Sequence, residues 1–148
     1  MKICVVGAGA IGGILAARLA RAGHDVSAIA RGPHLQAIRE RGLTLRDSDG
    51  VITANITATD APSDLEPQNY VIVTVKAPAL PGIAPTLTPL LRADTVVVTA
   101  MNGVPWWFCH ALPGPLAGRS LQSTDPNGVL GETLPRNRLL GCVVHAGA

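Results

Sequence analysis

The chain has 148 residues, enough for one domain with a sizeable buried core, and its 47% apolar and 15% charged composition excludes a disordered protein. Aromatic residues make up only 3%, so aliphatic side chains must fill the core, as in close-packed α/β layers. A net charge of +2, the lack of a 20-residue apolar run and the lack of a signal-peptide pattern predict a cytoplasmic protein that binds neither nucleic acid nor a membrane.

The chain begins with a strand, a glycine-rich turn and a helix. Residues 2–6 are an apolar run typical of a buried parallel strand, and residues 10–22 have apolar side chains at helical spacing before Gly23. Between them lies the turn Gly7-Ala8-Gly9-Ala10-Ile11-Gly12. In a dinucleotide-binding turn the three glycines allow a tight bend, close approach of a pyrophosphate, and packing of the helix on the strand. We therefore predict that residues 7–12 bind a dinucleotide; the alternative is a purely structural glycine turn.

Arg31 follows the second predicted strand, residues 26–30. An acidic residue at this point binds the ribose 2′-hydroxyl of NAD, whereas an arginine pairs with the 2′-phosphate of NADP. Residues 1–46 contain seven basic and two acidic residues, which also favours an anionic ligand. We predict NADP as the cofactor; the alternative is an ordinary surface arginine.

The next segment predicts a short helix and a hairpin. Gly32-Pro33 begins a helix that ends at Gly42, with Leu35 and Ile38 facing inward. Residues 43–45 and 51–53 flank the turn sequence Asp47-Ser48-Asp49-Gly50, which predicts a β-hairpin. Residues 60–69 are expected to form a polar loop.

Two further strands carry polar residues at their carboxyl ends. Residues 70–75 lead into Lys76, and residues 94–99 lead towards Asn102. Ligands of open α/β sheets bind at this edge, so both side chains are candidate ligands of the cofactor, with a flanking surface lysine and a simple Asn-Gly turn as the alternatives. Between the strands we expect a helix ending near Leu91, distorted by its prolines.

The C-terminal third contains an aromatic cluster, a Gly- and Pro-rich segment and a last strand. Trp106, Trp107 and Phe108 favour core packing, with a docking surface for a second domain or subunit as the alternative. Residues 111–137 show little periodicity, and residues 139–144 predict a strand.

The three cysteines indicate neither a disulfide framework nor a metal site. Cys4 and Cys142 lie in strand-like runs and are expected to be buried, and Cys109 completes an odd count. No grouping of histidine, cysteine and carboxylate has metal-ligand spacing.

Together these elements predict one α/β domain, residues 1–148, with a Rossmann-like, mostly parallel, doubly wound sheet and helices on both faces. The sequence also resembles the N-terminal domain of the ketopantoate reductase (2-dehydropantoate 2-reductase) family. The resemblance rests on Gly7–Gly12, Arg31, Val75-Lys76-Ala77, Asn102-Gly103-Val104 and Gly141-Cys142-Val143-Val144-His145.

Members of that family reduce ketopantoate to pantoate with NADPH, a step toward coenzyme A. The resemblance implies NADP contacts from the glycine turn, Arg31, Lys76 and Asn102, and a substrate contact from Asn102. In the family the general-acid lysine belongs to a helical C-terminal domain, which this sequence does not reach. We therefore expect the cofactor-binding half of a 2-keto-acid reductase, with no catalytic residue in this chain. We also expect a second copy of the chain or the helical domain of the family to pack near Trp106, Trp107 and Phe108. The alternative is a free-standing dinucleotide sensor without turnover.

Overall fold

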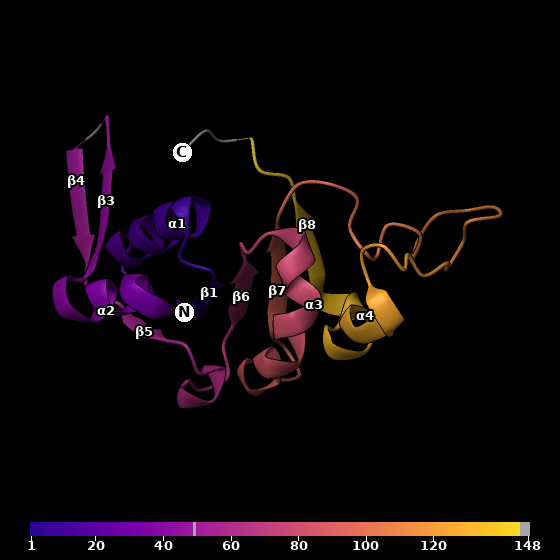
Figure 1. Ribbon diagram of the computed structural model, residues 1–148, viewed down its shortest axis with the longest axis horizontal. Coiled ribbons are helices and arrows are strands. Elements are labelled where there is room, and N and C mark those ends of the chain that lie inside the picture. The colour runs from indigo at the N-terminus through magenta and orange to yellow at the C-terminus, as the bar shows by residue number, and fades with distance from the viewer. Residues whose placement is uncertain (49, 146–148) are drawn as a thin grey trace.

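The computed structural model describes residues 1–48 and 50–145, so Asp49 of the predicted hairpin turn lies outside the described residues. Six parallel strands form one sheet in the order β5-β2-β1-β6-β7-β8, and an antiparallel hairpin, β3-β4, stands apart from it (Figure 1). This is the order of the doubly wound dinucleotide-binding fold, as predicted. The strands are β1 Lys2–Val6, β2 Asp25–Ile29, β3 Leu43–Asp47, β4 Gly50–Ala54, β5 Thr57–Thr59, β6 Tyr70–Val73, β7 Val96–Ala100 and β8 Leu139–Cys142.

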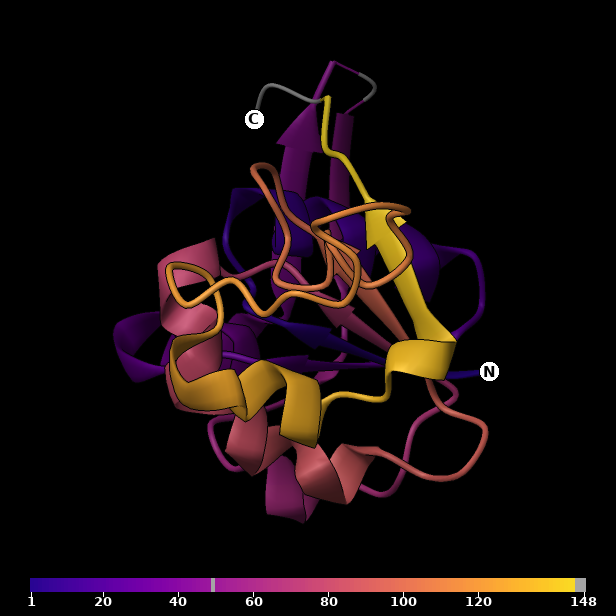
Figure 2. The same cartoon turned by 90° about the vertical axis from the view of Figure 1, so that its right-hand side faces the viewer.

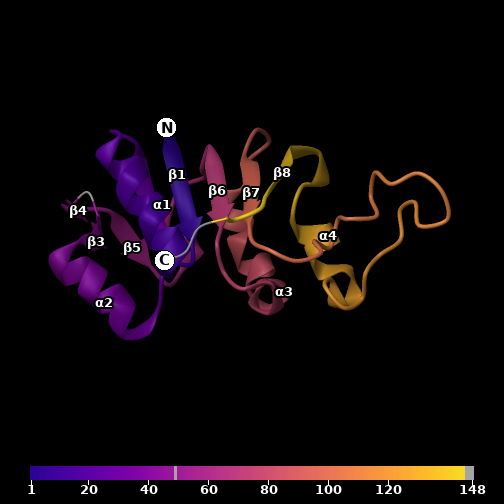
Figure 3. The same cartoon turned by 90° about the horizontal axis from the view of Figure 1, so that it is seen from above.

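Helices cover both faces of the sheet. The α-helices are α1 Ala10–Arg21, α2 Gly32–Arg41, α3 Leu80–Ile83 and α4 Val129–Thr133; 3-10 turns occupy Pro62–Asp64, Ala77–Ala79, Ala84–Leu90, Pro126–Gly128 and Arg136–Arg138. Two separate apolar clusters fill the space between the layers. One packs α1 and α2 on the sheet through residues such as Val5, Ala16 and Leu35, and the other packs α3 and α4 through Val6, Leu80 and Leu130. Viewed from above, α3 and α4 lie on the same side of β6, β7 and β8 (Figure 3).

Helix α1 ends as the glycine predicts. Gly23 has a φ of +85°, its N–H donates to the Ala20 oxygen, and the N–H of His24 donates to the Leu19 oxygen. This pair of bonds is a Schellman motif, which satisfies the last carbonyls of the helix. The chain is therefore turned sharply into β2, next to β1.

The predicted helix and hairpin after β2 are both confirmed. Helix α2 buries Leu35 and Ile38 and ends at Gly42, whose φ is +75°. The hairpin packs beside α1, and Arg18 of the helix pairs with Asp47 of β3 at 2.9 Å. Strand β5 was not predicted, because its three residues are too few to show an alternating pattern.

The prolines break up the connection between β6 and β7, as predicted. Only residues 80–83 are α-helical, and the segments on either side are 3-10 turns that begin at or contain prolines. The connection still buries Leu80, Leu87 and Leu90 against the sheet, so the layer is complete despite its irregular backbone.

The connection between β7 and β8 is long and largely irregular. It extends away from the sheet in the orange part of the chain, which Figure 2 brings to the front together with β8. It also contains α4, a short helix that the Gly- and Pro-rich sequence did not predict. The buried Asp125 carboxylate accepts hydrogen bonds from the N–H groups of Leu130 at 2.7 Å and Gly131 at 3.1 Å, which anchors the start of this helix.

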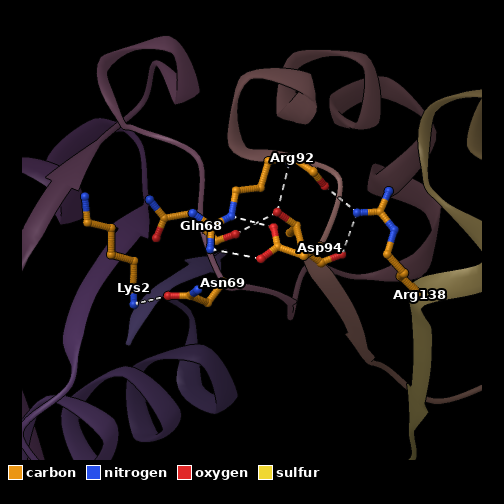
Figure 4. A network of polar contacts seen from close by, with 7 residues as sticks. Lys2, Gln68, Asn69, Arg92, Asp94 and Arg138 are labelled. Atoms are coloured by element: carbon orange, nitrogen blue, oxygen red, sulfur yellow. Dashed lines mark hydrogen bonds and ion pairs between the residues drawn. The ribbon is translucent and has the colours of Figure 1, made fainter.

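Polar contacts join the strands at the amino edge of the sheet (Figure 4). The Asn69 side chain accepts from the Lys2 N–H at 2.8 Å, and the buried Thr95 hydroxyl donates to the Gln68 oxygen at 2.6 Å. Arg138, just before β8, donates to the Thr95 oxygen at 3.2 Å. These bonds connect the starts of β1, β6, β7 and β8, so they stabilise the sheet.

Two of the cysteines are buried and one is exposed. Cys4 lies in the core, and burial raises the pKa of its thiol to about 11. Cys109 is also buried, whereas Cys142 is exposed, so the prediction that Cys142 is buried was wrong. The reason is that β8 is an edge strand and has three exposed residues in succession, Leu140 to Cys142.

Candidate functional site

Parallel strands bring the predicted site segments to one edge of the sheet. The glycine turn follows β1, Arg31 lies two residues beyond β2, Lys76 three residues beyond β6 and Asn102 two residues beyond β7. These strands are neighbours in the order β2-β1-β6-β7 and run in the same direction. All the predicted cofactor residues therefore gather at the carboxyl edge, next to the point where the strand order reverses.

The turn has the backbone geometry that its glycines predict. Gly7 has a φ of +99°, the left-handed region that glycine favours, and its N–H donates to the Ile29 oxygen at 3.0 Å. A Cβ on Gly12 would lie 1.9 Å from the Gly7 oxygen and 2.5 Å from Thr74 Oγ1. A Cβ on Gly9 would meet no atom within 4 Å. Gly7 and Gly12 are thus required by the fold, whereas the space at Gly9 is open.

The start of α1 presents unpaired backbone donors. Gly9 is the N-cap residue without a side-chain cap, and the first turn contains no acidic residue. In the part of the chain that the structure describes, the N–H groups of Gly9, Ala10 and Ile11 have no acceptor. Unpaired N–H groups and the positive end of the helix dipole favour an anion at this position.

Arg31 is an exposed residue that precedes α2 as its N-cap, in an extended conformation with a φ of −145°. Within residues 1–48 and 50–145, no carboxylate or carbonyl pairs with its guanidinium. The first residues of α2 lack a side-chain cap as well. A permanent positive charge beside the start of a helix is suited to binding a phosphate group.

Lys76 and Asn102 occupy the neighbouring strand ends. Lys76 is exposed and begins the 3-10 turn at Ala77–Ala79. Asn102 is exposed, but its amide is engaged: Nδ2 donates to the Val144 oxygen at 3.0 Å, and Oδ1 accepts from the Val144 N–H at 2.8 Å. An amide has a second N–H and a second lone pair, so one donor and one acceptor site of Asn102 remain.

Two side chains that the sequence did not single out contact the glycine turn. Thr74 Oγ1 lies 2.6 Å from the Gly7 oxygen, and His34 Nε2 lies 2.7 Å from the Ala8 oxygen. Both residues come from segments far from the turn in the chain. No local pattern marks them, because one contact depends on the pairing of β6 with β1 and the other on the position of α2 next to the turn.

The edge is shallow at this site. A small cavity of about 20 Å³ lies near the end of β7, lined by residues that include Ala77, Met101, Asn102 and Trp106. Wider open hollows of about 560 and 680 Å³ lie beside β4 and at the amino edge, away from the glycine turn. The carboxyl edge is therefore identified by its backbone donors and charges rather than by a deep pocket.

The aromatic cluster divides between core and surface. Trp106 is buried in the α3–α4 cluster, and Trp107 packs over β8, where a Cβ on Gly141 would lie 2.6 Å from its ring. Phe108 is 47% exposed, and Val104 and Leu116, which lie near it in the sequence, are also exposed. Core packing thus explains the tryptophans but not Phe108.

The described residues include neither a metal-binding cluster nor a helix that could span a membrane. Residues 1–48 and 50–145 contain no cluster of three or more histidine, cysteine, aspartate or glutamate side chains that could hold a metal ion. Among the same residues, every helix is too short or too polar to cross a lipid bilayer.

Comparisons with known proteins agree on one family. The family model described as "Ketopantoate reductase PanE/ApbA" matches residues 3–105. A 2-dehydropantoate 2-reductase from Mesorhizobium japonicum is 44% identical over 146 residues, covering 98% of this chain and 45% of that protein. One from Pyrococcus horikoshii is 35% identical over 104 residues, covering 70% of this chain and 34% of that protein. The chain therefore spans less than half the length of these curated relatives.

Solved structures give the same picture. A structure from Ralstonia solanacearum MolK2, described as a "putative ketopantoate reductase", superimposes with a TM-score of 0.92 at 49% identity, covering 98% of this chain and 45% of that one. A D-mandelate dehydrogenase solved with NADH and anilino(oxo)acetate has a TM-score of 0.71 at 22% identity, covering 94% of this chain and 39% of that one. The second likeness shows a shared fold alone.

Proposed function

Because the chain belongs to the ketopantoate reductase PanE/ApbA family, we propose that it is the NADP-binding part of a 2-keto-acid reductase of the 2-dehydropantoate 2-reductase type. The observation that carries the proposal is the carboxyl edge, where the start of α1, which has no side-chain cap, and Arg31, which pairs with none of the described residues, lie beyond neighbouring strands. The family match favours this reading over the free-standing dinucleotide sensor that the sequence alone left open.

The glycine turn and Arg31 have different roles in this proposal. The N–H groups of residues 9–11 bind the pyrophosphate, and the open space at Gly9 lets that group approach the backbone. Arg31 pairs with the 2′-phosphate, which NADP has and NAD lacks. A charged hydrogen bond contributes about 1.5–3 kcal/mol, so NADP is expected to bind more than tenfold more tightly than NAD.

Calorimetry with NADP⁺ and NAD⁺ tests this assignment. Arg31→Ala should remove most of the preference for NADP⁺ without affecting the affinity for NAD⁺. Arg41→Ala is the matched control, because Arg41 is an exposed arginine at the opposite end of the same helix. Equal affinity of the unchanged chain for the two dinucleotides would contradict the role of Arg31.

Lys76 and Asn102 complete the proposed site. These two residues would bind and orient the cofactor, whose reduced nicotinamide would supply a hydride for the keto carbon. The Lys76 ammonium attracts its anionic groups, and the remaining donor and acceptor of Asn102 bind the nicotinamide ribose or the 2-keto acid. The amide is already held by Val144, so it is oriented before any ligand arrives.

The proposed reaction also needs a proton donor for the developing alkoxide. None of the residues assigned here has that role, and the relatives are more than twice as long as this chain. We therefore expect this 148-residue chain to bind NADPH but to reduce ketopantoate at a negligible rate. NADPH oxidation should be measured beside the Mesorhizobium relative at equal concentration. Turnover within tenfold of the relative, about 1.4 kcal/mol in barrier, would show that these residues suffice.

We also propose that exposed apolar side chains of the C-terminal third, near the aromatic cluster and β8, dock either the rest of a longer protein or a second copy of the chain. Phe108, Leu140 and Val143 are 47%, 54% and 66% exposed, and β7 is the only strand that pairs with β8 among the described residues. Exposed apolar side chains beside an unpaired strand edge favour association. Light scattering should show self-association of the isolated chain, and Phe108→Ser should reduce it.

A further inference from the structure

The glycine turn is held by two side chains from outside the motif. His34 is in the first turn of α2, and its Nε2 lies 2.7 Å from the Ala8 oxygen. Thr74 follows β6, and its hydroxyl lies 2.6 Å from the Gly7 oxygen and 3.0 Å from the Val6 oxygen. A carbonyl oxygen cannot donate, so Nε2 of His34 must carry the proton in this contact.

These contacts fix the direction of the donors in the turn. The peptide bonds of the described chain are trans, and in a planar trans peptide the C=O and the following N–H point in opposite directions. Holding the Gly7 oxygen therefore orients the N–H of Ala8, and holding the Ala8 oxygen orients the N–H of Gly9. Because the Ala8 oxygen points towards His34, the N–H of Gly9 points away from it. This N–H has no acceptor among the described residues, so it is available to a ligand.

We propose that His34 and Thr74 are positioning residues that fix two consecutive peptide planes of the turn, so that the N–H of Gly9 is oriented for a pyrophosphate before the ligand binds. This inference rests on the proposed dinucleotide function. His34 is three residues after Arg31 on the same helical turn, but its bond is to the pyrophosphate turn and not to the 2′-phosphate site. The two residues should therefore affect different parts of the ligand.

The test compares three ligands with the intact 148-residue chain. NADP⁺ and NAD⁺ share the pyrophosphate, whereas adenosine 2′-monophosphate has the 2′-phosphate and no phosphate at the 5′ position. His34→Leu should weaken binding of both dinucleotides by about three- to tenfold, the value of one hydrogen bond, and leave binding of the monophosphate unchanged. His34→Gln retains an N–H donor and should restore most of the affinity. Arg31→Ala should have a different pattern: it should weaken NADP⁺ and the monophosphate and leave NAD⁺ unchanged.

The same experiment distinguishes the ways in which the inference can fail. If the unchanged chain binds neither dinucleotide, the proposed function fails and this inference with it. If the chain binds them but His34→Leu leaves both affinities unchanged, or weakens only the 2′-phosphate ligands, only the positioning role is refuted.

Two further measurements do not depend on that variant. Thr74→Val should weaken both dinucleotides, whereas Thr74→Ser should not, because serine keeps the hydroxyl. Long-range ¹H–¹⁵N NMR of the unchanged chain, at a pH where the His34 ring is neutral, should show the tautomer with the proton on Nε2. A neutral ring with its proton on Nδ1 would overturn the contact itself.

Discussion

Adding one methyl group at Gly9 or at Gly12 should have opposite consequences, although both glycines belong to the same motif. The Cβ that Gly12→Ala introduces would lie 1.9 Å from a backbone oxygen, where real contacts stay beyond 3.0 Å, so the start of α1 must shift by roughly 1 Å. Overpacking of this kind costs about 1–3 kcal/mol, and the better helix propensity of alanine recovers up to about 1 kcal/mol. With a net loss of about 1–2 kcal/mol and about 2–4 °C per kcal/mol for a chain of this size, Gly12→Ala should lower the melting temperature by about 2–8 °C.

Gly9→Ala should leave the melting temperature nearly unchanged, because its Cβ meets no atom within 4 Å and its φ of −70° is accessible to any residue. The methyl group instead occupies the space that the pyrophosphate needs, so NADP⁺ affinity should fall by about tenfold or more, and further in Gly9→Val. Thermal melts without ligand and calorimetry with NADP⁺ separate the two effects. Equal loss of stability in both variants would refute the distinction, as would full NADP⁺ affinity in Gly9→Val.

Three other predictions follow from the described contacts. Gly141→Ala places a Cβ 2.6 Å from the Trp107 ring, so it should cost about 1–3 kcal/mol of stability and change the tryptophan fluorescence, whereas Gly82→Ala, with open space, should not. A thiol reagent should label Cys142 rapidly and Cys4 and Cys109 only on unfolding, and equal rates would contradict their burial. Burial raises the pKa of the Cys4 thiol to about 11, whereas the pKa in the unfolded chain is ~8.5. The contribution of Cys4 to stability is therefore complete below the unfolded pKa and is lost as the pH rises through the folded pKa. Between these two pKa values the melting temperature should fall more steeply with pH in the unchanged chain than in Cys4→Ala.

The parts of the fold with a strong local pattern were predictable from the sequence. The glycine turn, the end of α2 at Gly42 and the β3-β4 hairpin each depend on residues within a few positions of one another, so periodicity and turn chemistry suffice. Strand β5 was missed because three residues are too short for an alternating pattern. Helix α4 was missed because a buried carboxylate from outside the helix, Asp125, stabilises its start.

The sequence predicted the positions of those candidate site residues that follow the ends of strands. Arg31, Lys76 and Asn102 lie at the carboxyl edge, as their positions after apolar runs predicted, although their roles as ligand contacts stay predictions. The contacts of His34 and Thr74 were beyond sequence reasoning, since they join residues 26 and 67 positions apart. The exposure of Cys142 has a similar cause, because the short apolar run of β8 does not reveal that this strand lies at the edge of the sheet.

The order of the strands also determines when the proposed site can form during folding. Strand β1 pairs on one side with β2 and on the other with β6, where Ile3 faces Tyr70. A growing chain therefore contains the entire glycine motif long before it contains β6 and Thr74. The pairing of β6, the Thr74 hydroxyl and the packing around them hold the motif in its conformation. Pairing across such a separation must first overcome the entropy of closing a long loop, which makes parallel sheets slow to fold. The glycine turn is thus local in sequence but acquires its conformation late, from residues that are synthesised well after it.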